Sequence, residues 1–421
     1  MKLWQKVIVG MVLGIILGWM MNVNGPFQTV EGKEYLKNYL QPFGNAFISL
    51  IKMVVVPLIF FSLITGVTSM TDQGAFKRVG LKAVFAFLTT AMFAVVIGLF
   101  FGSVFQPGQG VDLTEMIKNT GASTTATKAQ DFNLAKLLSD IIPENVVKAM
   151  SSNDHILQVV LFSIFTAFTI NALGDKVKLI REFCHTAATL IFKMIESIMN
   201  LAPYGVFAII ATVVSTQGLS IVADLAVLII TVAVALFVQY ILFGVMIVVF
   251  GKMSPMPFYK KMLEAQSFAF STSSSKATLP TAMRVLGQRL GVSKTSTSFV
   301  LPLGASINMD GTAIYLGVCT LFFAQAYGIE LHAHEYLLLI LTATLGSIGA
   351  AGIPGGSIMM MGMVFTSVGV PVEGVGIILG IDRILDMLRT TVNITGDSVI
   401  TMLVDKSEGT LDKEMYYNDK L

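Results

Sequence analysis

The stretch DRILDMLRTTVNITGD, residues 382 to 397, lies between the apolar segments GVGIILGI and SVITMLV. It places five charged residues inside an apolar run long enough to cross a bilayer: Asp382, Arg383, Asp386, Arg389 and Asp397. An ionised side chain at membrane depth costs about 3 kcal/mol or more, so such residues usually face a polar interior and serve a function.

The polar residues of this stretch share one side of the predicted helix. Successive spacings of four, three, four and four residues separate Asp382, Asp386, Arg389, Asn393 and Asp397, which places them on one face. We interpret this face as the lining of a cavity for a solute and an ion. Ion pairing inside a buried helix, for example of Asp386 with Arg389 or Arg383, is the alternative.

The composition indicates a polytopic membrane protein. Of 421 residues, 54% are hydrophobic and only 13% are charged, with a mean hydropathy of +0.76, whereas soluble proteins carry about 25% charged residues. The net charge of +2 and the absence of a basic stripe argue against a nucleic-acid partner. Cys184 and Cys319 stand alone in apolar surroundings, so neither a disulfide framework nor a metal site is predicted.

Lysine and arginine in the loops orient the predicted helices. Lys2 and Lys6 place the N-terminus in the cytoplasm, and basic loops alternate with six crossings up to about residue 250. Residues 263–283 and 336–368 are each interrupted and return to the side from which they start, which predicts re-entrant hairpins. We therefore expect an all-α fold of eight transmembrane helices and two hairpins, with a cytoplasmic C-terminus.

Three interrupted segments supply candidate ligands. NMDGT places Asn308, Asp310 and Thr312 in the middle of the seventh crossing, where oxygen atoms and free carbonyls can surround a small hard cation. Asp397 could complete a second such cage, and a glycine kink capped by Asn and Asp side chains is the alternative. STSSSKATLP and GIPGGS are ambiguous alone, since serine-rich turns are common and glycines serve either close backbone approach or a hinge.

Together these segments resemble a known family, the dicarboxylate/amino acid:cation symporters, which include glutamate transporters and archaeal aspartate transporters. The resemblance covers essentially the whole chain and is carried, in order, by SSSKATLP, LPLGASINMDGTAIY, SIGAAGIPGG and DRILDMLRTTVNITGD. It implies a plasma-membrane homotrimer that works as an elevator, with each protomer acting alone. The implied parts are a scaffold (1–76 and 111–218), a transport domain (77–110 and 219–408) and a cytoplasmic tail (409–421).

The resemblance also implies solute-binding residues. Asp386 would hold an ammonium group and Arg389 a side-chain carboxylate, a geometry that suits the fork of a guanidinium. The other implied residues are Thr312 beside that carboxylate, Thr390 as lining, Asn393 and Ser275 at the α-carboxylate, and Gly356 at the second hairpin tip.

Three sodium sites are implied in the same way. Asp397 with carbonyls of Gly304, Asn308 and Asn393 would form the first. Asp310, Asn308 and Thr90 would contribute to the second. The third would use Ser306 and carbonyls around Ser347, Ile348 and Ala350.

The chain departs from the family pattern at several of these positions. Phe87 and Ala91 stand where sodium-coupled relatives place a tyrosine and a serine, and Ala350 replaces a threonine. Lys276 stands at the first hairpin tip, where its ammonium group could replace a sodium ion near Asp310 or Asp386, or release a proton in a dry pocket. The alternative is that Lys276 extends into water. We expect coupling that differs from full sodium dependence and involves protons.

The predicted function is therefore uptake of L-aspartate or L-glutamate with Na⁺, H⁺ or both, without any other cofactor. A carrier of C4-dicarboxylates or neutral amino acids is the alternative. Asp386 favours an amino acid over succinate unless Lys276 or Arg383 neutralises it. An intramembrane protease is disfavoured because ITGD has Ile394 where a GxGD motif needs glycine. An ion channel is disfavoured because two gating hairpins around an arginine suit solute occlusion.

Overall fold

The protein is described by a computed structural model over residues 3–22, 36–68, 75–113, 142–151, 155–350 and 356–418. Every element in these ranges is a helix, which confirms the all-α class. The first half contains α1 (Leu3–Met20), α3 (Gln41–Thr68), α4 (Ala75–Phe105), α7 (Val146–Met150), α8 (Ile156–Leu173), α9 (Lys178–Met199) and α10 (Ala202–Gln217), with short turns η1 (Leu36–Leu40) and η3 (Gly174–Val177).

The second half carries the interrupted segments. Its helices are α11 (Ser220–Val249), α12 (Met256–Thr272), α13 (Ser275–Gln288), α14 (Lys294–Ile307), α15 (Asp310–Ala326), α16 (Ala333–Gly349), α17 (Gly356–Ser367), α18 (Val375–Ser407) and α19 (Lys413–Tyr417), with η4 (Val372–Gly374) before α18.

Four helical stretches in the described residues are long and apolar enough to cross a membrane, namely Arg78–Phe105, Gln158–Ile198, Ala223–Val249 and Lys294–Ala326. Shorter apolar helices include Gln5–Met20 and Ala333–Gly349. The charged helix α18 does not belong to this group, since it contains seven Asp, Arg and Lys residues. The number of crossings and the orientation of the termini stay predictions.

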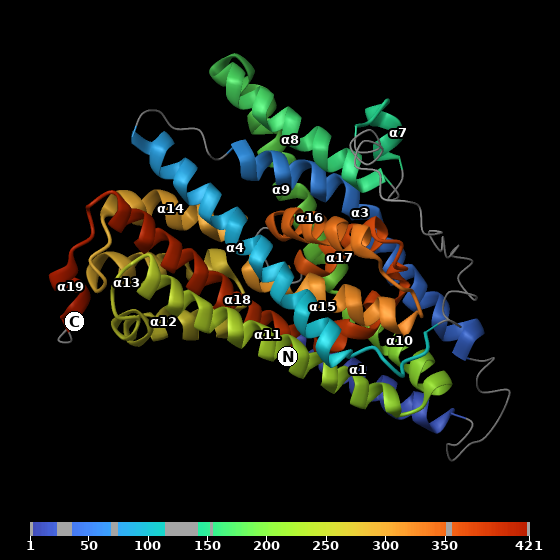
Figure 1. Cartoon of the computed structure of the whole chain (residues 1–421). Helices are drawn as coiled ribbons and strands as arrows, with labels where there is room; N and C mark the ends of the chain where they lie inside the picture. Colours follow the sequence, from blue (N-terminus) through green and yellow to red (C-terminus); the bar gives the residue numbers. More distant parts are fainter. Residues whose placement is uncertain are drawn as a thin grey trace.

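The helices form two packing groups. In the first, α1 packs along α10, while α3 contacts α8, α9 and α10. In the second, α18 contacts α11, α12, α13, α14 and α15, and α4 packs on α15. Figure 1 shows α18 running diagonally between these neighbours, with α15 beside α4. Helices α10, α16 and α17 contact both groups, so the second group lies against the first.

Glycines allow the close approach of α1 to α10. Gly10, Gly14 and Gly18 recur every four residues, and a Cβ at each would lie 2.4 to 2.8 Å from a carbonyl oxygen of α10. Such spacing of small residues lets transmembrane helices pack backbone to backbone. The stripe explains why these two short apolar helices form one tight pair.

The expected interruptions coincide with helix ends. Helix α12 stops at Ser273, which has left-handed backbone angles (φ 52°, ψ 36°), and Ser274 caps α13 by accepting a hydrogen bond from the Ala277 amide. Helices α12 and α13 pack side by side, as do α16 and α17. The seventh predicted crossing is interrupted at Asn308 and Met309, between α14 and α15.

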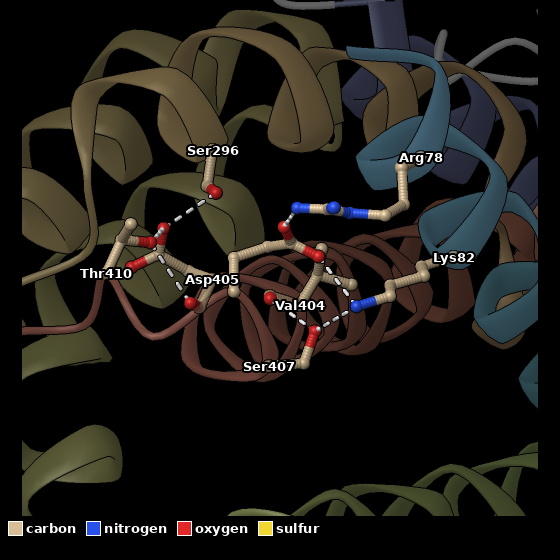
Figure 2. A network of polar contacts seen from close by, with 8 residues as sticks. Arg78, Lys82, Ser296, Val404, Asp405, Ser407 and Thr410 are labelled. Atoms are coloured by element: carbon tan, nitrogen blue, oxygen red, sulfur yellow. Dashed lines mark hydrogen bonds and ion pairs between the residues drawn. The ribbon is translucent and has the colours of Figure 1, made fainter. Parts of the chain in front are cut away.

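A polar network joins the C-terminal end of α18 to its neighbours (Figure 2). The buried Asp405 carboxylate accepts hydrogen bonds from the Ser296 hydroxyl (2.7 Å) and the Thr410 hydroxyl (2.6 Å). Beside it, Glu408 forms ion pairs with Arg78 and with Lys82 on α4. This end of α18 is therefore fixed to α14 and α4 by charged and neutral hydrogen bonds.

Candidate functional site

A small polar cavity lies where the tips of the helix pairs α12–α13 and α16–α17 meet α18 and the break between α14 and α15. Its lining is polar apart from one methionine and one alanine: Ser273, Ser275, Met309, Thr312, Ala350, Ser357, Asp386, Thr390 and Asn393. The structure thus brings together five predicted solute-binding residues from segments more than a hundred residues apart. Gly356 is not among the lining residues, and its neighbour Ser357 is.

Arg389 lies behind the cavity wall. Its Nη2 atom donates to Oδ1 of Asp382 (2.9 Å) and to Oδ1 of Asp386 (3.0 Å). The guanidinium carbon sits 3.9 Å from the centre of the Tyr315 ring, a cation–π contact. The residue is 1% exposed, yet its Nε and Nη1 atoms have no hydrogen-bond partner among the described residues.

Asp386 has contacts that are relevant to both interpretations of the α18 stripe. Asp386 pairs with Arg389 within the helix, and Asp386 also lines the cavity. Leaving buried guanidinium donors unpaired is costly. The arrangement therefore leaves Arg389 free to bind a further acceptor while Asp382 and Asp386 hold one edge of its fork.

Lys276 does not lie at the acidic residues where one hypothesis placed it. Its ammonium group lies 5.4 Å from the ring centre of Phe192 on α9, and the residue is exposed. It is not among the cavity-lining residues. Arg383 is only partly buried and forms no ion pair in the described residues. Neither cation neutralises Asp386 by direct contact, since Asp386 pairs with Arg389.

Carboxylate and amide oxygens converge where the first cation site was expected. The Asn308 side chain donates to Oδ1 of Asp397 (3.0 Å), and Oδ2 of Asp397 is buried without a hydrogen-bond partner in the described part of the chain. Gly304 lies against this carboxylate, because a Cβ there would be 2.9 Å from Oδ1. A hard cation prefers such oxygen ligands. Asp397, Asn308 and the Gly304 segment therefore fit a cation of the sodium type.

Asp310 has a second, separate environment. Gln239 on α11 donates to its Oδ2 atom (3.5 Å), whereas Oδ1 is buried without a partner. The Thr90 hydroxyl donates to Oδ1 of Asn308 (3.2 Å), so the three residues implied for this site are neighbours. Phe87, buried on the same helix as Thr90, adds no oxygen here.

The residues implied for the third cation site lie on α14 and α16, which contact each other. The hydroxyl of Ser306 donates to the Pro302 carbonyl, and that of Ser347 donates to the Thr344 carbonyl. Ile348 precedes the end of α16, and Ala350 lines the cavity. Each hydroxyl donates its hydrogen and keeps its oxygen lone pairs, so these hydrogen bonds do not exclude either serine as a cation ligand.

No group of three or more His, Cys, Asp and Glu side chains gathers within the described ranges in a way that suits a transition metal. The acidic residues of the site instead lie beside amide and hydroxyl groups. This donor set is oxygen-rich and suits alkali cations or protons.

Several site residues were not anticipated from sequence. Ser273, Met309 and Ser357 line the cavity, Gln239 contacts Asp310, and Tyr315 stacks on Arg389. Ser273 and Ser357 stand beside predicted residues in the two quoted tip motifs, so their neighbourhood was a signal. Gln239, by contrast, is a lone amide in an apolar helix. An amide at membrane depth needs a partner, which was a signal for a buried polar contact.

Comparison with known proteins agrees with this geometry. Residues 3–407 match the sequence model of the Sodium:dicarboxylate symporter family. The chain belongs to this family. The resemblance drawn from the motifs is thereby confirmed, as is the expectation of a transporter rather than an enzyme. Family membership and the apolar helices identify an integral membrane protein.

Full-length relatives of this Sodium:dicarboxylate symporter family member carry different substrate names. A proton/sodium-glutamate symport protein from Bacillus caldotenax is 34% identical over 98% of this chain and 95% of its own length. A C4-dicarboxylate transport protein from Agrobacterium fabrum is 36% identical over 98% of this chain and 89% of its own length. A proton/glutamate-aspartate symporter from Escherichia coli is 32% identical over 98% of this chain and 94% of its own length.

Proposed function

We propose that this protein is a secondary active symporter that takes up acidic amino acids, L-aspartate or L-glutamate, together with Na⁺, H⁺ or both. The observation that carries the proposal is the pairing of Asp386 on the cavity wall with Arg389 directly behind it, whose Nε and Nη1 donors lack partners. An acidic amino acid offers an ammonium group for the first and a carboxylate for the second.

The buried cluster offers a partner for each of two charged groups of an acidic amino acid, a carboxylate for its ammonium group and a guanidinium for its side-chain carboxylate. Asp382 and Asp386 share one guanidinium, which leaves one negative charge in excess. An ammonium group beside Asp386 offsets that excess, and a carboxylate then takes over part of the guanidinium fork from Asp386. Thr312, Thr390, Asn393 and Ser275 supply neutral hydrogen-bonding groups to the remaining carboxylate oxygens.

A C4-dicarboxylate is the second candidate substrate, because relatives with that name align over 98% of the chain. Such a solute has no ammonium group for Asp386. It binds well only where Asp386 stays paired with Arg389, as it is in this structure. The relative affinities for aspartate and succinate therefore measure how far Asp386 is released from its ion pair with Arg389.

For coupling, we assign one cation to Asp397, Asn308 and the Gly304 carbonyl region, and a second cation or a proton to Asp310 with Thr90 and Asn308. Unpartnered carboxylate oxygens on both aspartates support this assignment. Relatives named as proton/sodium or proton symporters are consistent with either ion. We assign a third cation to Ser306, Ser347, Ile348 and Ala350, which lie on or directly after the contacting helices α14 and α16.

We further propose a homotrimer whose α4 and α11–α18 group moves as a transport domain against a scaffold of α1, α3 and α8–α10. The contacts support this division, since α18 packs against α11, α12, α13, α14 and α15 of the second group. In this arrangement the helix pairs α12–α13 and α16–α17 serve as the two gates to the cavity, because their tips line it.

The decisive experiment measures equilibrium binding of L-aspartate, L-glutamate and succinate to purified protein and to an Arg389→Cys variant. Loss of a charged hydrogen-bonding partner should weaken acidic-solute binding by about tenfold to a hundredfold. Arg284→Cys is the matched control, because Arg284 pairs with Glu264 at the surface. Unchanged aspartate affinity in Arg389→Cys would remove Arg389 from the pocket and contradict the proposal.

Uptake into proteoliposomes under separate sodium and pH gradients identifies the coupling ion. We expect a contribution from protons in addition to any sodium dependence, since Phe87 and Ala91 leave fewer oxygens near Asp310. Strict sodium dependence with no effect of a pH gradient would refute proton coupling.

A further inference from the structure

Gln239 is the only amide side chain of the apolar helix α11, and it is 3% exposed. Its Nε2 atom lies 3.5 Å from Oδ2 of Asp310, at the outer limit of a hydrogen bond, and its Oε1 atom has no hydrogen-bond partner within the described ranges. Gln266, a second buried glutamine, uses both ends of its amide: Nε2 donates to the Thr395 hydroxyl (3.0 Å), and Oε1 accepts from the Tyr240 hydroxyl (3.2 Å). Gln239 is thus held weakly at one end and unsatisfied at the other, which is costly for a buried amide.

Asp310 contributes a second oxygen of the same kind. Its carboxylate is fully buried, and its Oδ1 atom has no hydrogen-bond partner in the described part of the chain. Both atoms, Oε1 of Gln239 and Oδ1 of Asp310, are acceptors, so neither can satisfy the other. A hard cation can satisfy several such oxygens at once, because carboxylate, amide and hydroxyl oxygens are its preferred ligands.

The spacing of the two side chains suits a shared ion. A glutamine amide can turn about its terminal bond and bring its oxygen to the place of its nitrogen, which lies 3.5 Å from Oδ2 of Asp310. Oxygens that surround a hard cation at about 2.4 Å, at right angles to each other, are about 3.4 Å apart. The observed distance therefore fits two ligands of one ion better than it fits a hydrogen bond.

Helix α11 closes this side of the site. Phe243 lies one turn after Gln239, and a Cβ at Gly396 would be 2.6 Å from Cζ of Phe243 and 3.1 Å from Oδ2 of Asp310. Helix α11 is therefore in close contact with α18 beside the carboxylate, and Gln239 is the amide that it brings there. On the α4 side, Phe87 is buried and adds no side-chain oxygen, so an oxygen from α11 would enlarge the ligand set.

We propose that the side-chain oxygen of Gln239 is a ligand of the cation bound at Asp310, so that α11 takes part in this cation site. The inference rests on the proposed assignment of a cation to Asp310 and deepens it by one ligand, from a helix outside the interrupted segments. Without the cation, the amide donates weakly to Asp310, as in this structure. With the cation, the amide turns, and its oxygen and the carboxylate bind the same ion.

The test follows the unfolding temperature of the purified protein in detergent, without solute, as sodium chloride replaces choline chloride at constant ionic strength. Sodium that binds the folded protein raises this temperature. Gln239→Leu removes one oxygen ligand, so the sodium concentration for half of the rise should increase about tenfold. Gln239→Glu keeps an oxygen at this place and should retain the wild-type sodium dependence or bind sodium more tightly. A role only as hydrogen-bond donor predicts the opposite, because an ionised glutamate cannot donate and repels Asp310.

Gln266→Leu is the matched control. It removes a buried glutamine that is satisfied within the protein, so it should lower the unfolding temperature in choline chloride and leave the sodium dependence unchanged. A double-mutant cycle adds a second readout. Gln239→Leu should have little further effect on sodium dependence when combined with Asp310→Asn, since both substitutions remove ligands of the same ion.

Three results would overturn this inference: wild-type sodium dependence in Gln239→Leu, an equal loss in Gln239→Leu and Gln239→Glu, or independent effects in the cycle. A wild-type protein whose unfolding temperature does not respond to sodium overturns it as well. The proposed uptake of acidic amino acids is tested separately, by L-aspartate binding to wild type and to Arg389→Cys. Aspartate binding that is lost in Arg389→Cys leaves that function standing whatever the sodium result.

Discussion

At the scale of single residues, Arg389 shows how a charge is kept at membrane depth. Two carboxylates and an aromatic face surround it, so that one edge of its fork is satisfied without any solute. Asp382 is the partner that does not line the cavity. In the proposed function Asp382 would retain the guanidinium while Asp386 turns to a solute, which would keep Arg389 in place.

Gly304 provides a residue-scale prediction about the first cation site. A Cβ there would lie 2.9 Å from Oδ1 of Asp397 and 2.9 Å from Cζ of Phe87. Overpacking of this kind costs about 1–3 kcal/mol, so Gly304→Ala should raise the cation concentration for half-maximal uptake about tenfold. In Gly287→Ala the nearest heavy atom is 3.9 Å away, and uptake should be unaffected. An unchanged cation concentration for half-maximal uptake in Gly304→Ala would mean that Gly304 is not part of the cation site.

The polar stripe of α18 was the part of the site that sequence could predict. Helical spacing alone places Asp386, Asn393 and Asp397 on one face, and the structure buries all three. Spacing could not predict the rotamer of Arg389, because that depends on the Tyr315 ring contributed by another helix. It also could not place Lys276, whose long side chain reaches Phe192 on α9 instead of the acidic residues.

At the scale of elements, the break between α14 and α15 is stabilised from outside. The Asn393 side chain of α18 accepts a hydrogen bond from the Gly311 amide (2.7 Å), near the start of α15. A Cβ at Gly311 would lie 2.6 Å from the Arg389 carbonyl, so α15 begins pressed against α18. A side-chain amide thus caps the broken helix beside the cavity, as the capped-kink alternative expects in kind, while the ligand interpretation stays a prediction.

The glycine stripe of α1 gives a prediction about helix pairing. Gly14→Val would place side-chain atoms where the Phe207 carbonyl lies, 2.8 Å from the Cβ position. We expect a loss of about 1–3 kcal/mol in stability, measured as a lower unfolding temperature in detergent. Leu13→Val, on an exposed position of the same helix, is the control and should change little. Equal unfolding temperatures for the two variants would mean that the packing of α1 against α10 does not depend on this contact.

The packing role of the glycines at every fourth residue of α1 became evident only from the fold. Hydropathy identified the N-terminal segment as a helix, and only the fold shows that it pairs with α10, almost two hundred residues away. Segment breaks were predictable because Ser, Gly and Asn punctuate them. The sequence could not show which of the broken segments face each other, because that depends on contacts between distant helices.

At the scale of the whole molecule, the contact between Lys276 and Phe192 spans the two packing groups. Lys276 belongs to α13 in the α18-centred group, and Phe192 belongs to α9, which packs on α3. If the groups move relative to each other during transport, this contact must break in each cycle. Because a cation–π pair near a surface is weak, about 0.5–1 kcal/mol, it can mark one end of the movement without preventing it.

A cross-link at this contact tests the movement. We expect Lys276→Cys with Phe192→Cys, joined by a short thiol-reactive linker, to stop uptake while aspartate binding in detergent persists. Each single cysteine variant treated with the same reagent should still transport. Native Cys184 and Cys319 are buried and should react little. Normal uptake by the fully cross-linked protein would rule out relative movement of the groups at this point.

The anchoring of the C-terminal segment has a practical consequence. Lys261 on α12 donates to the carbonyls of Met415 (2.9 Å) and Tyr416 (2.9 Å), and the Asp412 amide donates to the Gly291 carbonyl (2.9 Å). These hydrogen bonds attach the short helix α19 to α12 and to the turn that follows α13. A fluorophore attached near residue 418 would consequently stay with the α12–α13 pair, and its distance to a dye on α9 would show in real time whether the proposed movement of the two groups occurs.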